Sequence, residues 1–408
     1  MSRKSGQEFR RGRSRVNTLL YVAIVAVSAS VGVFYWITLH AVAGYLESLS
    51  SGDHGMWGGP VVSEGHVYVG TRDRTVRCLD AASGAVRWSR ATGSLVAAAP
   101  AISYGTVYVG SEDGKVHAFD ASTGKVRWTH ATGGAIVSSP AVKGGMVYVG
   151  SDDHTIYALD AATGTLRWRR TVGDRVESSP SIASGTVYIG SNDDSVYALD
   201  AARGKVRWTH SFDGDVDTVA AVGGRVFVGS ADFTGYQVSA LDAASGALRW
   251  TRTGGYSDLA VANGTLYANN DTGDLYALDA ASGTTRWVRR NPHADGVSGV
   301  AIADRGTVYV AGWHRFFALD AATGRQRWSS RAGQGWGWGP APAVLGTVVF
   351  VSDRNGVVYA LNRATGRRVF TSRPPGRGDR PATSATRGGG TGRPTPTAAS
   401  ARRRRPSP

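Results

Sequence analysis

The chain has 408 residues, enough for two or three ordinary domains, and a formal net charge of +15. Most of this charge lies at the ends, because residues 1–15 hold six basic residues and one acidic residue, and residues 373–408 hold nine arginines and one aspartate. Residues 57–372 hold 31 basic and 27 acidic residues without a basic stripe, so we expect no nucleic-acid partner. Cys78 is the only cysteine, which excludes an intrachain disulfide.

The N-terminal segment predicts a membrane anchor. Residues 16–46 contain no Lys, Arg, Asp or Glu, and their most apolar part, 19–39, is long enough as a helix to span a bilayer core of about 30 Å. The positive-inside rule then places residues 1–15 in the cytoplasm and the rest of the chain outside the cell membrane. A cleavable signal peptide is the alternative, since Ala-Val-Ala at 41–43 resembles a cleavage site, and both alternatives export the remainder of the chain. Residues 47–56, rich in Ser and Gly, are expected to form a linker.

Residues 57–372 repeat one pattern, Leu-Asp-Ala-x-x-Gly-x-x-Arg-Trp, which is most regular at 159–168. A period near 40 residues is typical of propellers and solenoids. The acidic position is held by Asp80, Asp120, Asp160, Asp200, Asp242, Asp279 and Asp320, with Asn362 as a degenerate eighth member. The aromatic position is held by Trp88, Trp128, Trp168, Trp208, Trp250, Trp287, Trp328 and Phe370. Because burial of a large ring in every copy stabilises a fold, we interpret these eight residues as structural docking positions between repeats.

Each repeat carries signals for four short strands, A to D. The Asp side chain can accept backbone N–H groups of its own turn and the Gly can adopt a positive φ, so Asp-Ala-x-x-Gly predicts the hairpin between strands C and D. A Val-Tyr-Val-Gly run upstream predicts strand B, and a shorter run before it predicts strand A. We therefore predict an all-β protein with an eight-bladed β-propeller of four-stranded antiparallel blades at 57–372. The sequence leaves open how the ring closes.

The C-terminal segment 373–408 is rich in Arg, Gly and Pro and ends with four consecutive arginines at 402–405. Such a composition cannot bury enough apolar surface to fold, so we expect a disordered tail. It would suit contact with an anionic envelope polymer or lipid.

Two groups of residues are candidates for binding. The B–C loops and D–A connections vary among the repeats and would share one face of the propeller, where Glu177, Asp217 and Asp258 enter successive innermost strands. Acidic residues in loops are also common turn formers, which is the simpler interpretation. An aromatic group follows from Trp57, Trp313, His314, Trp336 and Trp338, which lie in the first, seventh and eighth repeats. These aromatic side chains would either line the mouth of the central channel of the propeller or pack where the ring of blades closes, since Phe370 replaces a tryptophan there.

The pattern Asp-Ala-x-Thr-Gly-x-x-x-Trp, at 160–168 and 320–328, resembles the tryptophan-docking repeat of the pyrroloquinoline quinone (PQQ) propellers. This resemblance implies the eight-bladed fold and admits three roles: a calcium- and PQQ-dependent dehydrogenase, a non-catalytic scaffold such as BamB, or a sensor module. The dehydrogenases require a disulfide between adjacent cysteines, which Cys78 alone cannot supply. We therefore expect no PQQ, no calcium site and no catalytic residue.

The sequence thus predicts a membrane-anchored, extracytoplasmic propeller that serves as a protein-binding or scaffold module of the cell envelope. Its partner would be an envelope protein or an anionic polymer. A small-molecule, quinone-binding sensor is the alternative, and a dehydrogenase is the third possibility.

Overall fold

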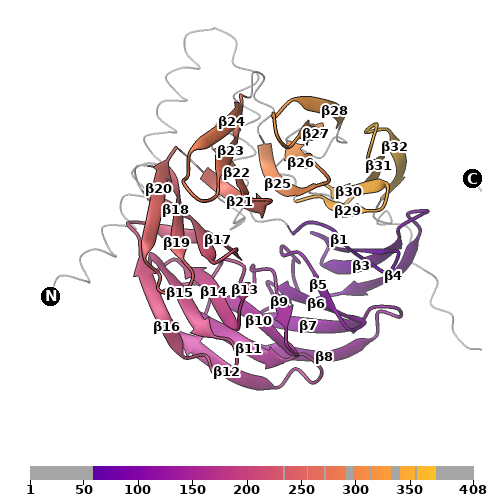
Figure 1. Ribbon diagram of the computed structural model, residues 1–408. Coiled ribbons are helices and arrows are strands. Elements are labelled where there is room, and N and C mark those ends of the chain that lie inside the picture. The colour runs from indigo at the N-terminus through magenta and orange to yellow at the C-terminus, as the bar shows by residue number, and fades with distance from the viewer. Residues whose placement is uncertain are drawn as a thin grey trace, which may run out of the picture.

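The computed structural model describes residues 58–232, 235–254, 256–270, 273–290, 297–312, 315–331, 341–353 and 356–373. Eight four-stranded sheets are arranged as blades around a central axis (Figure 1). The predicted anchor at 16–46, the linker at 47–56 and the tail beyond Arg373 lie outside the described residues. Within the described ranges, no helix has the length and apolar character needed to cross a membrane.

Every blade consists of four consecutive strands. In blades 1 to 4 the strands are β1 (Val61–Ser63), β2 (His66–Gly70), β3 (Thr75–Asp80), β4 (Val86–Ala91), β5 (Ala101–Ser103), β6 (Thr106–Ser111), β7 (Lys115–Asp120), β8 (Val126–Ala131), β9 (Ala141–Lys143), β10 (Met146–Ser151), β11 (Thr155–Asp160), β12 (Leu166–Thr171), β13 (Ser181–Ala183), β14 (Thr186–Ser191), β15 (Ser195–Asp200) and β16 (Val206–Ser211). In blades 5 to 8 they are β17 (Asp215–Val222), β18 (Arg225–Asp232), β19 (Gly235–Asp242), β20 (Leu248–Thr253), β21 (Tyr256–Ala262), β22 (Thr265–Asn270), β23 (Leu275–Asp279), β24 (Thr285–Arg289), β25 (Val297–Asp304), β26 (Thr307–Gly312), β27 (Arg315–Asp320), β28 (Gln326–Arg331), β29 (Ala343–Leu345), β30 (Val348–Ser352), β31 (Val358–Asn362) and β32 (Arg368–Ser372).

Neighbouring strands within each blade are antiparallel, in the order A, B, C, D from the axis outward. The predicted eight-bladed, all-β propeller is therefore confirmed for the described part of the chain. The last blade, β29–β32, and the first, β1–β4, lie side by side and share a hydrophobic cluster, and among the described residues they exchange no strand (Figure 1).

The hairpin between strands C and D follows directly from the repeat. In blade 3 the Asp160 Oδ1 accepts hydrogen bonds from the amides of Ala162 (3.0 Å) and Thr163 (2.9 Å), and Gly164 has a φ of 73°. The Arg167 guanidinium donates to Asp160 Oδ2 at 2.6 Å. Arg167 is also the extra residue of a β-bulge between β11 and β12, which turns Trp168 toward the next blade.

The tryptophans of the repeat lie between blades. The Trp128 Nε1 donates to the carbonyl of Ala161 in the next blade (3.0 Å), and its ring lies where a Cβ on Gly164 would be. The Tyr108 hydroxyl donates to the same carbonyl at 2.9 Å. Because each hydrophobic cluster includes side chains from two blades, the core is a chain of interfaces around the ring.

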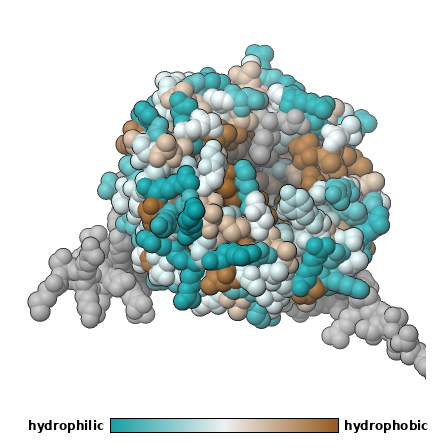
Figure 2. Space-filling view, turned by 60° about the horizontal axis from the view of Figure 1, so that its bottom comes forward, coloured by the Kyte–Doolittle hydropathy of each residue, from teal (hydrophilic) through white to brown (hydrophobic). Residues whose placement is uncertain are grey.

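Two faces of the disc result from this topology. We call the side with the A–B and C–D turns the turn face, and the side with the B–C loops and D–A connections the loop face. On the turn face the amide of Ala161 donates to the carbonyl of Gly145, which joins the two turns of a blade. One face, in the space-filling view, is hollowed near its centre, with hydrophilic side chains along the rim (Figure 2).

Candidate functional site

The loop face was the predicted binding surface, and three of its aspartates, Asp113, Asp153 and Asp193, prove to be structural. In blade 3 the Asp153 Oδ2 accepts the amide of Gly133 at 2.7 Å and the Tyr157 hydroxyl at 2.5 Å. Gly133 belongs to the connection from the preceding blade, so this carboxylate joins two blades and a strand C side chain. Asp193 makes the equivalent bonds in blade 4, to Gly173 (2.7 Å) and Tyr197 (2.6 Å).

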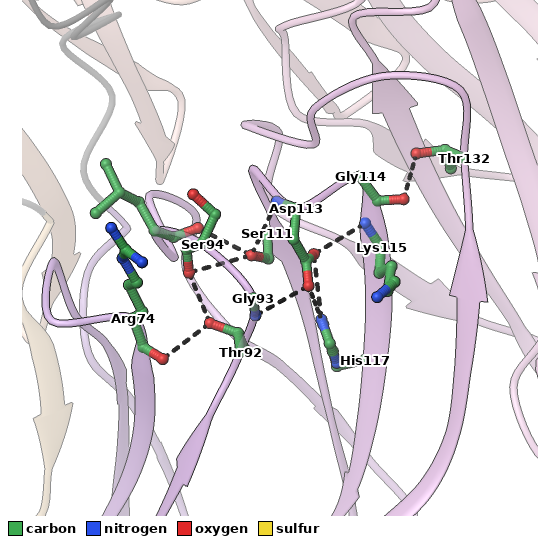
Figure 3. Close-up of polar contacts among 11 residues, drawn as sticks. Arg74, Thr92, Gly93, Ser94, Ser111, Asp113, Gly114, Lys115, His117 and Thr132 are labelled. Atoms are coloured by element: carbon green, nitrogen blue, oxygen red, sulfur yellow. Dashed lines mark hydrogen bonds and ion pairs between the residues drawn. The ribbon is translucent and has the colours of Figure 1, made fainter.

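Blade 2 replaces the tyrosine with a histidine (Figure 3). The Asp113 Oδ2 lies 3.1 Å from His117 Nε2 and accepts the Gly93 amide at 3.0 Å, while Oδ1 accepts the Lys115 amide at 3.1 Å. Both side chains of the pair are 9% exposed. Burial lowers the pKa of His117 against the opposing effect of Asp113. The His117 ring is stacked on Phe119, and we interpret the pair as part of the same inter-blade brace.

The acidic candidates lie where the loop face meets the innermost strands. Glu177 precedes β13, its side chain is 15% exposed, and its Oε1 is 3.8 Å from Arg175 Nη1. Asp217 lies in β17 at a register shift relative to β18. Asp258 lies in β21, and its side chain is not described. The described ranges contain no group of three or more His, Cys, Asp or Glu side chains placed to hold a metal ion.

The aromatic candidates Trp57, Trp313, His314, Trp336 and Trp338 all lie outside the described residues. Their convergence at the channel mouth stays a prediction.

The structure adds a serine ladder, a pair of hydrogen bonds that join the segments before the innermost strands of blades 2, 3 and 4, which we did not predict. The Ser139 Oγ accepts the amide of Ala99 at 3.0 Å, and the Ser179 Oγ accepts the amide of Ser139 at 2.9 Å. Each bond joins equivalent positions of adjacent blades, 40 residues apart. The preceding serines, Ser138 and Ser178, bond to the backbone of Gly150 and Gly190 within their own blades. The recurrence of Ser-Ser-Pro at this spacing was the available signal.

Blades 5 to 7 depart from this arrangement. Their innermost strands β17, β21 and β25 have eight, seven and eight residues, whereas the innermost strands of the other five blades have three. The additional residues extend toward the loop face, where Asp215 pairs with Ala231. The hairpin of β18 and β19 also reaches further, to the pair Asp232 and Gly235. The sector formed by blades 5 to 7 therefore has its own shape on an otherwise regular face, and it includes Asp217 and Asp258.

Cys78 has a packing role. It lies in β3 opposite Trp88, is fully buried, and burial raises the pKa of its thiol to about 11. A buried thiol of this kind is a poor nucleophile.

Comparison with known proteins agrees with the fold. The family model described as outer membrane protein assembly factor BamB matches residues 23–138, 116–214, 209–312 and 293–391. Among solved structures, BamB from Moraxella catarrhalis is 18% identical, with a TM-score of 0.63, and the match covers 74% of this chain and 95% of that one. The computationally designed Ika8 protein is 18% identical, with a TM-score of 0.67 and coverages of 76% and 98%.

A europium-containing methanol dehydrogenase is 15% identical, with a TM-score of 0.60 and coverages of 74% and 81%. At these identities the structures show a shared fold and nothing about activity. No curated protein sequence matches this chain. The family model, in contrast, covers nearly the whole propeller in four overlapping segments. The chain therefore belongs to the PQQ-like propeller family of the outer membrane protein assembly factor BamB.

Proposed function

We propose that this protein is a membrane-anchored, extracytoplasmic propeller that binds a partner protein and acts as a non-catalytic scaffold of the cell envelope. The family description, an assembly factor, supports a role in bringing proteins together. The apolar segment 16–46 behind six basic residues supports the anchor and the export of the propeller.

The loop-face sector of blades 5 to 7 is the observation that carries this proposal. The turn face repeats the same contacts in nearly every blade, which is what stability alone requires. In the sector, three long innermost strands and an extended hairpin replace the regular geometry. Variation confined to one sector of a repeated scaffold is typical of a binding surface.

The described residues do not fit a PQQ site. The family's dehydrogenases place a disulfide of adjacent cysteines against the quinone, and Cys78 is single, buried and packed beneath Trp88. Glu177 lies beside Arg175, and the guanidinium of Arg175 would compete with a calcium ion for the carboxylate of Glu177. We therefore assign neither PQQ nor calcium to this chain.

Site-specific photo-crosslinking in cells tests the scaffold role. A photoreactive residue at Asp213 or Tyr236, both exposed on the loop face near the sector, should give a discrete protein adduct. The same residue at Asn263, exposed at a turn-face tip, is the matched control and should not give that adduct. Identical adducts from both faces, or none from either loop-face position, would contradict the proposal.

A titration with PQQ and calcium tests the cofactor assignment. Tryptophan emission of the full chain should not change. Saturable, calcium-dependent quenching that disappears in Trp338→Ala would instead support the small-molecule sensor.

A further inference from the structure

The exposed apolar residues of the propeller lie almost entirely on one face. Ten large hydrophobic residues are exposed among those with described side chains, and only Tyr236 is on the loop face. Three of the others are at the A–B turns: Tyr104 lies in a turn, and Val222 and Leu345 end the A strands that lead into their turns. The remaining six lie at the start of the D strands: Val86, Val126, Leu166, Val206 and Leu248 are the first residues of their strands, and Val369 is the second residue of β32. Tyr104 is 93% exposed with a φ of 47°, so neither packing nor backbone preference accounts for a bulky ring there.

The same face is basic. The eight C–D segments, from the docking Asp or Asn to the seventh residue after it, contain fourteen lysines and arginines but only seven aspartates. Each of these aspartates is already neutralised by an arginine of its own blade, as Asp160 is by Arg167. In contrast, Lys125, Lys205 and Arg325 are exposed and take part in no ion pair among the described residues. The turn face therefore combines aliphatic side chains with uncompensated positive charge.

The loop face has the opposite charge. The B–C loops of blades 1 to 4 and the connections into blades 4 and 5, residues 71–75, 111–115, 151–155, 191–195, 172–180 and 212–217, hold twelve acidic and four basic residues. A disc with one basic face and one acidic face is oriented by a charged surface, because the two faces experience opposite forces.

From these observations we propose that the turn face docks on an anionic lipid bilayer. The geometry favours a planar partner over a globular one. Repetition places the D-strand aliphatics at equivalent positions in five consecutive blades, so a flat surface meets them together along the arc. A bilayer offers what both groups require: anionic headgroups for the lysines and arginines, and acyl chains for the aliphatic side chains and Tyr104. This orientation presents the acidic loop face to the aqueous side.

The orientation is compatible with an N-terminal anchor. Ser372 pairs with Val358 just after a B–C loop, and the chain enters β1 from the loop side, so both ends of the propeller are on the loop face. Strands of six residues are about 20 Å long. The eleven residues 47–57 span at most roughly 36–40 Å, which exceeds the sum of the strand length and about 14 Å for the three strand spacings between strand A and the edge of the disc.

Depth-dependent quenching in vesicles tests the proposal with the full chain. An environment-sensitive dye is attached at Tyr104→Cys in a Cys78→Ala background, since alanine occupies the equivalent position in other blades. The protein is reconstituted in phosphatidylcholine vesicles with or without phosphatidylglycerol, and both preparations contain a lipid that carries a quencher in its acyl chain. We expect quenching only with phosphatidylglycerol. A dye at Asp213→Cys on the loop face should stay unquenched in both.

Charge reversal separates the two faces. The triple variant Lys125→Glu, Lys205→Glu and Arg325→Glu should lose the quenching at residue 104. The matched triple variant on the loop face, Lys115→Glu, Arg74→Glu and Arg175→Glu, carries the same change in charge and should keep it. Circular dichroism checks that both variants are folded.

Three outcomes would overturn the proposal: equal quenching at residues 104 and 213, quenching that does not require phosphatidylglycerol, or loss in both triple variants. Lipid-independent association of two copies through residue 104, detected by sedimentation, would assign the face to self-association instead. None of these results depends on what the loop face binds, so the scaffold role is tested separately.

Discussion

The carbonyl oxygen of Ala161 accepts hydrogen bonds from both Trp128 and Tyr108 of the preceding blade, and equivalent carbonyls do so in most of the ring. A backbone carbonyl has two lone pairs, and here both are used to join blades. The neighbouring Gly164 is needed twice, because its φ of 73° suits glycine and because the Trp128 ring occupies the space of a Cβ. One short turn therefore determines the hairpin and the interface together.

Gly164→Ala separates these two requirements when it is compared with Gly144→Ala. Both glycines have a positive φ, but a Cβ at 164 would lie 2.5 Å from Trp128 Cε3, whereas at 144 nothing lies within 4 Å. Displacement of the ring should cost about 1–3 kcal/mol beyond the backbone strain that the two variants share. Urea unfolding, followed by tryptophan fluorescence, measures the difference. Equal midpoints for the two variants would show that the tryptophan contact is not limiting.

The Asp160 and Arg167 pair predicts how stability depends on pH. The Arg167 hydrogen bond, followed by those from Thr163, lowers the pKa of Asp160 from 3.8 to about 2 in the folded state. The carboxylate therefore stabilises the fold above the unfolded pKa, and this contribution is lost as the pH falls through the folded pKa. Arg167→Gln should destabilise at neutral pH, and its difference from the parent protein should become much smaller near pH 2. Denaturant midpoints at both pH values test this, with the exposed Arg169→Gln as a pH-insensitive control.

At the scale of single elements, blade 5 departs from the docking scheme. Phe227 occupies the position of the strand B tyrosine, and the Trp250 Nε1 is buried without a hydrogen-bond partner among the described residues. Phe227 packs in one cluster with Ala280, whose position corresponds to Ala161. The tryptophan and strand B positions of blade 5 therefore contribute apolar packing to the contact with blade 6, whereas Trp128 and Tyr108 also donate hydrogen bonds to the next blade.

Phe227→Tyr should restore one of these bonds. A hydroxyl at this position would point toward the carbonyl of Ala280, as the Tyr188 hydroxyl does toward Ala243 at 2.9 Å. A buried hydrogen bond contributes roughly 0.5–1.5 kcal/mol, so the unfolding midpoint should rise. The reciprocal change, Tyr188→Phe, should lower it by a similar amount. A destabilising Phe227→Tyr would show that the Ala280 carbonyl is inaccessible to the hydroxyl.

The strands could be predicted because their signals are local. Asp160, Gly164 and Trp168 act within nine residues, and the turn they form requires no knowledge of the rest of the chain. The serine ladder and the loop-face aspartates were missed because their partners are remote, 40 residues from Ala99 to Ser139 and 20 from Gly93 to Asp113. Such contacts exist only once the blades are placed side by side. Asp113, Asp153 and Asp193 are for this reason braces between blades, while a binding role of Glu177, Asp217 and Asp258 stays a prediction.

At the scale of the whole molecule, stability depends on how the ring is closed. Each blade is a continuous segment of the chain. Among the described residues, no blade combines strands from the two ends of the propeller. The closing interface contains Phe370 in the place of tryptophan, 6.2 Å from Phe350, and its ring lies against Gly84 of blade 1. A phenyl ring has no N–H group to donate, so the closing interface lacks the indole hydrogen bond made at the regular interfaces.

Phe370→Trp should therefore strengthen the closure. The surroundings match those of the other docking tryptophans, because Gly84 has a φ of 75° and Ala81 packs in the same cluster as residue 370. The new Nε1 should reach the Ala81 carbonyl, as Trp88 Nε1 reaches that of Ala121 at 2.8 Å. One hydrogen bond and a larger buried ring should stabilise by about 1–2 kcal/mol. Hydrogen exchange should show added protection concentrated in blades 1 and 8, because the change acts on their shared interface. Protection spread evenly over all blades would mean that opening of the ring at this interface is not the first step of unfolding.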